Sequence, residues 1–182
     1  MRTYAPIGSV RTDFPGKFGI PRQSGILEEA ESVVILNPEF ARPGVFRGLE
    51  GFSHVWLLWD FSSVPEGKWS PTVRPPRLGG NRRVEVFASR SPFRPNPIGL
   101  SCVRLVRIDP EKGELVVAGA DLADGTPVLD IKPYVPFTDC RPDASEGYTA
   151  RTKQNRMTVQ ADPGLLELLP EDRRSVLLRI LE

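Results

Sequence analysis

An arginine-rich segment between residues 68 and 94 carries the densest charge in this sequence. It holds seven basic residues and a single acid, Glu85. The arginine guanidinium presents a fixed fork of donors that matches phosphate oxygens, so the segment suits an RNA backbone. A solvated surface loop is the alternative, although solubility alone hardly explains so many cations with so little acid. The arginines are Arg74, Arg77, Arg82, Arg83, Arg90 and Arg94.

Residues 86–101 read as a strand, a loop braced by three prolines, and a second strand. Each proline fixes its own φ angle and restricts the residue before it, so Arg90, Arg94 and Asn96 have little conformational freedom to lose on binding. We infer a preorganised ligand site in this loop. A stiff turn between two strands, without a ligand, is the alternative.

Two carboxylates within residues 121–134 are candidates for proton transfer. Asp124 precedes Gly125 at a tight turn between two expected strands, a pattern that is not specific by itself. Asp130 and Lys132 alternate with apolar residues, which places a carboxylate and an ammonium group on one face of a strand. A surface ion pair explains this arrangement equally well.

Other groups able to act as nucleophiles or metal ligands are sparse. His54 is the single histidine and lies in an apolar run, where a core or interface histidine is commoner than a catalytic one. Cys102 and Cys140 lack the paired spacing of a zinc site or a disulfide framework. We therefore expect no bound metal. No run of about 18 apolar residues occurs, so we also expect a soluble, cytoplasmic protein.

These residues need a scaffold, and the apolar pattern predicts a mainly β one. Apolar runs bounded by Pro, Gly, Asn and Asp predict seven short strands, which imply a closed or nearly closed barrel. Residues 43–49 are expected to form a helical turn that plugs or caps this barrel. The strands are expected at residues 4–11, 31–37, 52–61, 82–88, 99–109, 114–121 and 127–135.

Size and charge set the domain organisation and the mode of binding. The chain has 182 residues with 40% hydrophobic content, enough for one good core. We expect a barrel domain at residues 1–142 and a small C-terminal α/β appendage at residues 143–182. Within the appendage, a strand is expected at 157–161 and helical structure at 163–181, with a helix start at Pro170. The net charge is only +1, so RNA affinity must come from a local patch.

Five segments of the sequence, in order and in spacing, resemble the TsaA-like (TrmO) family. The resemblance extends from residue 4 to about residue 142 and is loose in the appendage, which we expect to be shortened relative to longer members. Five long segments in register are far more specific than any single motif above. The segments are residues 20–23, 47–54, 71–81, 87–100 and 124–134.

The resemblance implies a β-barrel methyltransferase that uses S-adenosylmethionine and methylates N6 of threonylcarbamoyladenosine at position 37 of tRNA, within the anticodon stem-loop. It also implies a homodimer with the cofactor near the subunit interface. The absence of a Gly-x-Gly-x-x-Gly motif opening a βαβ unit is compatible with this. By resemblance, the cofactor is lined by Pro21, Arg22, Gln23, Ser62, Ser63, Arg90, Leu100, Asp121, Leu122, Ala123 and Asp124.

Such a reaction is an in-line displacement in which the protein mainly supplies alignment and desolvation. A proton acceptor near the carbamoylated N6 would help, and Asp124 and Asp130 are the candidates. The arginines of residues 74–83 are expected to pair with the threonyl carboxylate, and RNA contacts are expected from Arg74, Arg77, Arg82, Arg83 and Arg94. A barrel that binds tRNA or a small anion without catalysis is the competing interpretation.

Overall fold

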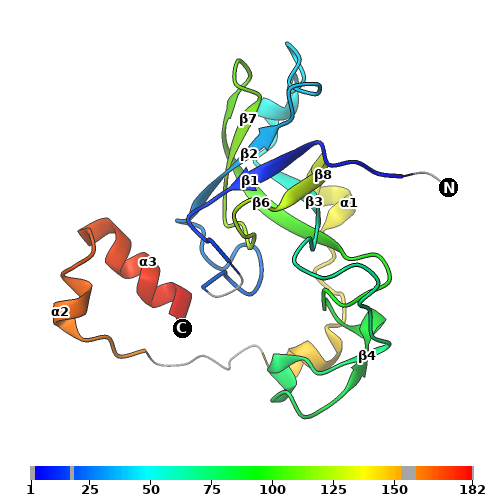
Figure 1. The fold of residues 1–182 in the computed structure, drawn as a ribbon, viewed down its shortest axis with the longest axis vertical. Helices are drawn as coiled ribbons and strands as arrows, with labels where there is room; N and C mark the ends of the chain where they lie inside the picture. Colours follow the sequence, from blue (N-terminus) through cyan, green and yellow to red (C-terminus); the bar gives the residue numbers. More distant parts are fainter. Residues whose placement is uncertain (1–2, 17–18, 153–158, 182) are drawn as a thin grey trace.

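Six antiparallel strands close into a barrel in the order β1, β2, β7, β6, β3, β8 (Figure 1). The computed structural model describes residues 3–16, 19–152 and 159–181. A barrel of short strands agrees with the expected fold class, although it has six strands rather than seven. The barrel strands are β1 (Gly8–Arg11), β2 (Glu31–Leu36), β3 (His54–Asp60), β6 (Ile98–Asp109), β7 (Glu114–Ala118) and β8 (Pro127–Pro133).

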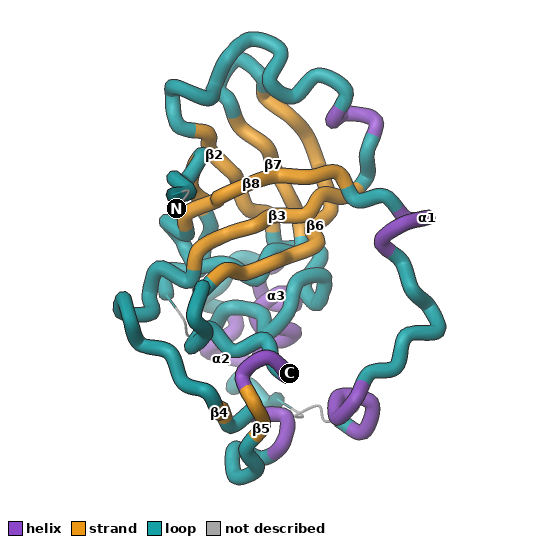
Figure 2. Tube along the Cα trace, turned by 90° about the vertical axis from the view of Figure 1, so that its right-hand side faces the viewer, coloured by secondary structure: helices purple, strands orange, loops and turns teal. Residues whose placement is uncertain are grey.

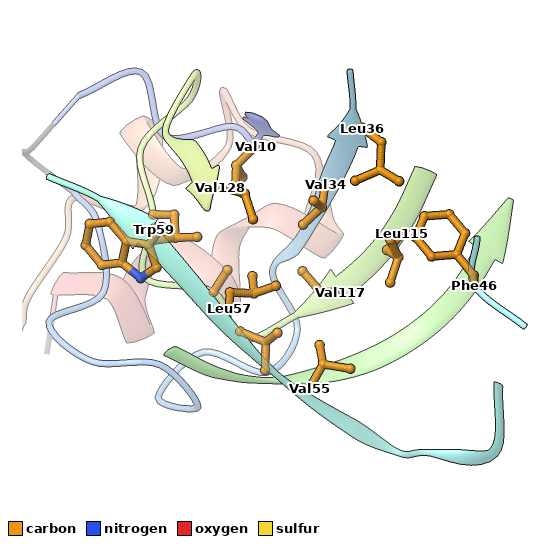
Figure 3. Packing of buried hydrophobic residues seen from close by; sticks show 13 residues of the cluster. Val10, Val34, Leu36, Phe46, Val55, Leu57, Trp59, Leu115, Val117 and Val128 are labelled. Carbon is orange, nitrogen blue, oxygen red and sulfur yellow. The ribbon is translucent and has the colours of Figure 1, made fainter. Parts of the chain in front are cut away.

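The core lies inside this barrel because apolar and polar side chains alternate along its strands. In β3, Val55, Leu57 and Trp59 point inward and are buried, while the residues between them are only half-buried. Figure 3 shows Trp59 and Phe46 at opposite ends of the buried cluster. The expected turn at residues 43–49 leads into the short 3-10 helix η1 (Leu49–Gly51), and its Phe46 belongs to the core.

The strand expected at residues 82–88 is wrong as a barrel strand. Only β5 (Val84–Glu85) forms there, paired with β4 (Thr72–Val73) in a separate two-stranded sheet. The chain then turns into the 3-10 helix η3 (Val86–Ala88). Prolines 75 and 76 follow β4 and cannot donate ladder hydrogen bonds, which keeps this hairpin short. The hairpin lies apart from the barrel in both views (Figures 1 and 2).

In the C-terminal part, the regular structure that the described residues form is helical. Beyond β8 lie α1 (Pro136–Asp139), the 3-10 helix η4 (Gly147–Arg151), α2 (Pro163–Leu166) and α3 (Glu171–Leu181). The helical pattern is thus split, and α3 begins directly after Pro170 as expected. Asp162 caps α2 by accepting from the backbone N–H of Gly164 at 2.7 Å.

Two further expectations concern this region. The strand expected at 157–161 lies partly outside the described residues, and residues 159–161 have no regular structure. The domain division at residue 142 stays a prediction. Within the described ranges, no helix has the length and apolar character needed to cross a membrane.

Gly99 on β6 makes a close contact on which the core depends. A Cβ at this position would overlap the indole ring of Trp59 on the neighbouring strand β3. Because the ring packs among core side chains and cannot move freely, Gly99→Ala is expected to lower the free energy of unfolding by about 2 to 3 kcal/mol. Urea denaturation measures this loss.

Gly51→Ala is the matched control for Gly99→Ala, since nothing lies within 4 Å of a Cβ added there. Its free energy of unfolding should stay close to that of the original protein. Equal stability of the two variants would mean that Trp59 does not pack on Gly99.

Candidate functional site

The loops that carry the predicted cofactor residues gather at one end of the barrel. In the antiparallel order, β1, β3 and β7 end here, and β2, β6 and β8 begin here. The segment between β1 and β2 is tied to the end of β7 by two backbone bonds, from Gly25 N–H to the Gly119 carbonyl at 2.9 Å and from Gly119 N–H to the Ala30 carbonyl at 3.1 Å. This end is therefore built from three chain segments that are distant in sequence.

Gln23 and Arg90, predicted from separate motifs, meet at this end. An Nη1 donor of Arg90 binds Oε1 of Gln23 at 2.7 Å. The Gln23 Nε2 group donates to the carbonyl of Arg22 at 2.6 Å, so both ends of the amide are held. Arg90 remains exposed, and its other guanidinium donors are available to a ligand with negatively charged oxygens.

Asp121 adds a partly buried carboxylate to the same place. Ser101 Oγ donates to Asp121 Oδ1 at 2.5 Å, and Trp59 Nε1 donates to Ser101 Oγ at 2.9 Å. Burial raises the pKa of the Asp121 carboxyl, although hydrogen bonds from Ser101 and the Ser24 backbone and the charge of Arg90 oppose this. The folded chain therefore holds this proton more tightly than the unfolded chain does. The contribution of Asp121 to the free energy of unfolding therefore falls as the pH rises from 3.8, the ordinary pKa of this carboxyl, toward its higher pKa in the folded chain.

The other residues of 121–124 support the loop framework. Leu122 is buried in the core, and the Ala123 carbonyl accepts from Thr126 Oγ1 at 2.7 Å. Asp124 is exposed, and its Oδ1 accepts from the backbone N–H of Thr12 at 3.0 Å. Its own N–H donates to the Phe14 carbonyl at 2.8 Å. Asp124 thus fixes the start of the segment that leads to Gln23.

The remaining predicted cofactor residues differ in their surroundings. Pro21 is buried beside exposed Arg22, in the segment that also carries Gln23. Ser62 and Ser63 form an exposed turn after β3, next to the bond from Phe61 N–H to the Pro97 carbonyl at 2.8 Å. Leu100 lies on the outer face of the barrel, because it alternates along β6 with the inward-facing Ser101. It lines a shallow hollow with Trp56 and Lys132 rather than the Arg90 cluster.

Asp130 lies in the middle of β8 and forms an ion pair with Lys132 at 2.7 Å. Its other oxygen accepts from the N–H of Ile131 at 2.9 Å. This is the arrangement that the alternation of the two residues predicted. The structure does not bring Asp130 into contact with Arg90 or Asp121, and its role as a proton acceptor stays a prediction.

The arginine-rich segment surrounds the small β4–β5 hairpin. Arg74, Arg82 and Arg83 are exposed, and within the described ranges none of the three forms an ion pair or a hydrogen bond. Arg77 donates to the Thr152 carbonyl at 3.4 Å. Arg94 is different, because its Nη1 donates to the carbonyls of Ser89 at 3.0 Å and Ser91 at 3.3 Å and so braces its own loop.

Sequence reasoning missed Ser101 and Trp59 as partners of the site. A signal for Ser101 was present, because it occupies an inward position of an apolar strand between Gly99 and Val103. A hydroxyl at such a position needs a hydrogen-bond partner. The sequence carried no signal that this partner would be Asp121, 20 residues away.

Comparison with known proteins agrees with this architecture. Residues 9–140 match the family model described as the tRNA-methyltransferase O N-terminal domain. A tRNA (adenine(37)-N6)-methyltransferase of Escherichia coli (strain K12) is 46% identical over 158 residues, which are 86% of this chain and 67% of that protein. A protein of the same name from Eikenella corrodens is 60% identical over 100 residues, 54% of this chain and 57% of that protein.

Solved structures give the same result. A crystal structure of TrmO superposes with a TM-score of 0.68 at 42% identity, covering 81% of this chain and 64% of that one. A crystal structure of TrmO from Pseudomonas aeruginosa superposes with a TM-score of 0.66 at 41% identity, covering 81% of this chain and 62% of that one. The chain thus spans about two thirds or less of the length of these relatives. The resemblance inferred from five sequence segments is confirmed, and the chain belongs to the TsaA-like family of tRNA-methyltransferase O N-terminal domains.

Proposed function

We propose that this protein transfers a methyl group from S-adenosylmethionine to N6 of threonylcarbamoyladenosine at position 37 of tRNA, and that it does so in the cytoplasm. The observation that carries the proposal is the cluster of Gln23, Arg90 and Asp121 at the end of the barrel where β1, β3 and β7 end. The names of the relatives from E. coli and E. corrodens support the substrate.

The charges of this cluster fit the cofactor. S-adenosylmethionine carries a carboxylate and, when bound, supplies a methyl group on a positively charged sulfur. Arg90 offers the guanidinium that a carboxylate requires, and Gln23 orients that guanidinium through the 2.7 Å bond. Asp121 offers a carboxylate whose charged form is disfavoured by burial, so a cationic ligand would relieve that cost.

The RNA is held, in this proposal, by the exposed arginines of the β4–β5 hairpin. Among the described residues, the side chains of Arg74, Arg82 and Arg83 have no partner, and exposed Arg77 has only the 3.4 Å bond to the Thr152 carbonyl. All four can therefore pair with phosphates or with the threonyl carboxylate. A site built for a charge pair disfavours the substrate that lacks the charge, so unmodified adenosine should be rejected. The enzyme would then act after the class of reaction that attaches the threonylcarbamoyl group.

The test is transfer of labelled methyl from S-adenosylmethionine to two tRNA samples, one carrying threonylcarbamoyladenosine and one carrying plain adenosine. We expect label in the modified sample only. Equal labelling of both samples would contradict the proposed specificity. Cofactor and tRNA binding without any transfer would favour the non-catalytic barrel.

We further propose that the protein works as a homodimer formed through the outer face of β3 and β6. Ile98 and Leu100 point outward there and are 47% and 55% exposed. Next to Leu100, Leu58 extends this apolar surface on the neighbouring strand. Trp59 contributes nothing to that face, because its ring is buried in the core of the same subunit.

Sedimentation equilibrium at tens of micromolar is expected to give twice the mass of the chain, and Leu100→Glu is expected to give the monomer because it places a charge in the apolar contact. Tyr4→Glu is the matched control, since Tyr4 is 73% exposed in the segment that precedes the barrel. A monomeric original protein would rule out this interface.

A further inference from the structure

Phe87 is an unusually exposed aromatic residue within the arginine-rich segment. Its side chain is 75% exposed, although the two residues before it are a strand residue and the buried Val86. A single exposed apolar side chain is common on a protein surface, so exposure alone identifies no ligand. Phe87 is distinguished by the Arg94 guanidinium beside its ring. Its immediate surroundings therefore decide what it could bind.

The backbone under Phe87 is held firmly, so the ring is presented at a fixed place. Val86 is buried at 2% exposure, and its N–H donates to the Pro71 carbonyl at 2.8 Å. The Val86 carbonyl in turn accepts from the Ser89 N–H at 3.1 Å and from Ser89 Oγ at 2.8 Å. A short 3-10 turn with both ends bonded leaves the Phe87 ring pointing outward.

The ring is also supported from one side. The guanidinium carbon of Arg94 lies 5.9 Å from the centre of the Phe87 ring, within the range of a cation–π contact. Arg94 is itself fixed by its bonds to the carbonyls of Ser89 and Ser91. This support limits the motion of the ring and adds positive charge beside it.

The place of Phe87 along the chain links the two parts of the proposed site. Arg90, which contacts Gln23 in the cofactor cluster, follows three residues later. Arg82 and Arg83, which are exposed and suited to phosphate, precede it by five and four residues. In the sequence, the ring thus lies between the arginines proposed to bind phosphate and the arginine proposed to bind the cofactor. A flat apolar ring in such a segment suits a nucleic-acid base better than an aliphatic or acidic ligand.

We propose that Phe87 is a stacking platform for an unpaired base of the anticodon loop. The inference rests on the proposed function, because it takes the tRNA loop as the ligand of the arginine-rich segment. Stacking is sequence-tolerant, so Phe87 holds the loop open near the cofactor while the arginines hold its backbone. The ring contributes to RNA affinity without contributing charge.

The experiment measures binding of an anticodon stem-loop RNA to three variants at several salt concentrations. Phe87→Ala is expected to weaken binding about fivefold with an unchanged salt slope, because a stacking contact releases no counterions. Phe87→Trp is expected to restore the affinity. Phe137→Ala is the matched control, since Phe137 is 87% exposed on α1 outside the arginine-rich segment, and it should bind as the original protein does.

A second measurement identifies the base. Stem-loops with one abasic position each are bound to the original protein and to Phe87→Ala. At the stacked position, removal of the base should weaken RNA binding by the original protein and leave RNA binding by Phe87→Ala unchanged. This comparison is a double-mutant cycle across the contact. The absence of such a position would overturn the proposal.

Other results would also overturn it. Undiminished RNA binding by Phe87→Ala would show that the ring touches no base, and a changed sedimentation mass would assign Phe87 to a protein interface. Failure of the proposed function looks different. The original protein would then bind the stem-loop and depend on Phe87 for that affinity, yet transfer no methyl group.

Discussion

Replacing Arg90 by alanine is expected to weaken S-adenosylmethionine binding by about 100-fold. The substitution removes the charge-assisted hydrogen bonds proposed for the cofactor carboxylate. It also removes the 2.7 Å bond to Gln23, so the segment from residues 20 to 23 is no longer held to the proline-braced loop. Isothermal titration calorimetry measures the change directly.

Arg42→Ala is the control for Arg90→Ala. Arg42 is also exposed and also donates to one oxygen, the Glu39 carbonyl at 3.2 Å, but it lies at the opposite end of the barrel. The cofactor affinity of the Arg42→Ala variant should equal that of the original protein. The cofactor affinity of Gln23→Ala should lie between those of Arg90→Ala and Arg42→Ala, because this substitution removes the support of Arg90 but keeps its guanidinium. Normal cofactor affinity in folded Arg90→Ala would exclude Arg90 from the cofactor site.

The double substitution Arg74→Ala with Arg77→Ala is expected to weaken tRNA binding by about 30-fold at low salt. It should also reduce the slope of log affinity against log salt by roughly one unit for each phosphate that the variant no longer neutralises. S-adenosylmethionine affinity should stay unchanged, because the cofactor cluster is formed by other residues. Filter binding across a salt series provides both numbers.

The double substitution Arg42→Ala with Arg47→Ala is the control, because it also removes two positive charges but does so at the other end of the barrel. Both of these arginines are exposed. If the two double variants weaken tRNA binding equally, the effect is one of net charge, and the hairpin is not the RNA surface. Loss of cofactor binding in a folded Arg74 and Arg77 variant would show that the two ligands share these groups.

Most of the barrel was predictable because alternation of apolar and polar residues is a local property. It was clearest in β3, where Val55, Leu57 and Trp59 alternate with less buried residues. The same pattern gave a wrong prediction at residues 82–88, where the apolar residues form a short 3-10 turn and not a barrel strand. Closure with six strands is a property of the whole sheet, and no local pattern specifies it.

The candidate site was predictable in part, and for a different reason. The motifs identified Gln23, Arg90 and Asp121, and the fold brings these together from three loops. The resemblance placed Leu100 at the cofactor, but the structure does not bring it together with these three side chains. Leu100 and Ser101 are adjacent in sequence, yet one faces outward and the other faces the core, because side chains alternate across a strand.

The chain of hydrogen bonds from Trp59 through Ser101 to Asp121 makes the proposed site optically visible. Of the three tryptophans, Trp59 is 8% exposed and Trp69 is 52% exposed, while Trp56 is half-buried and bonds to Asp139. A change in the charge or contacts of Asp121 reaches the Trp59 indole through a single hydroxyl. In a variant with Trp56 and Trp69 replaced by phenylalanine, the fluorescence of Trp59 can therefore follow events at the carboxylate without any added dye.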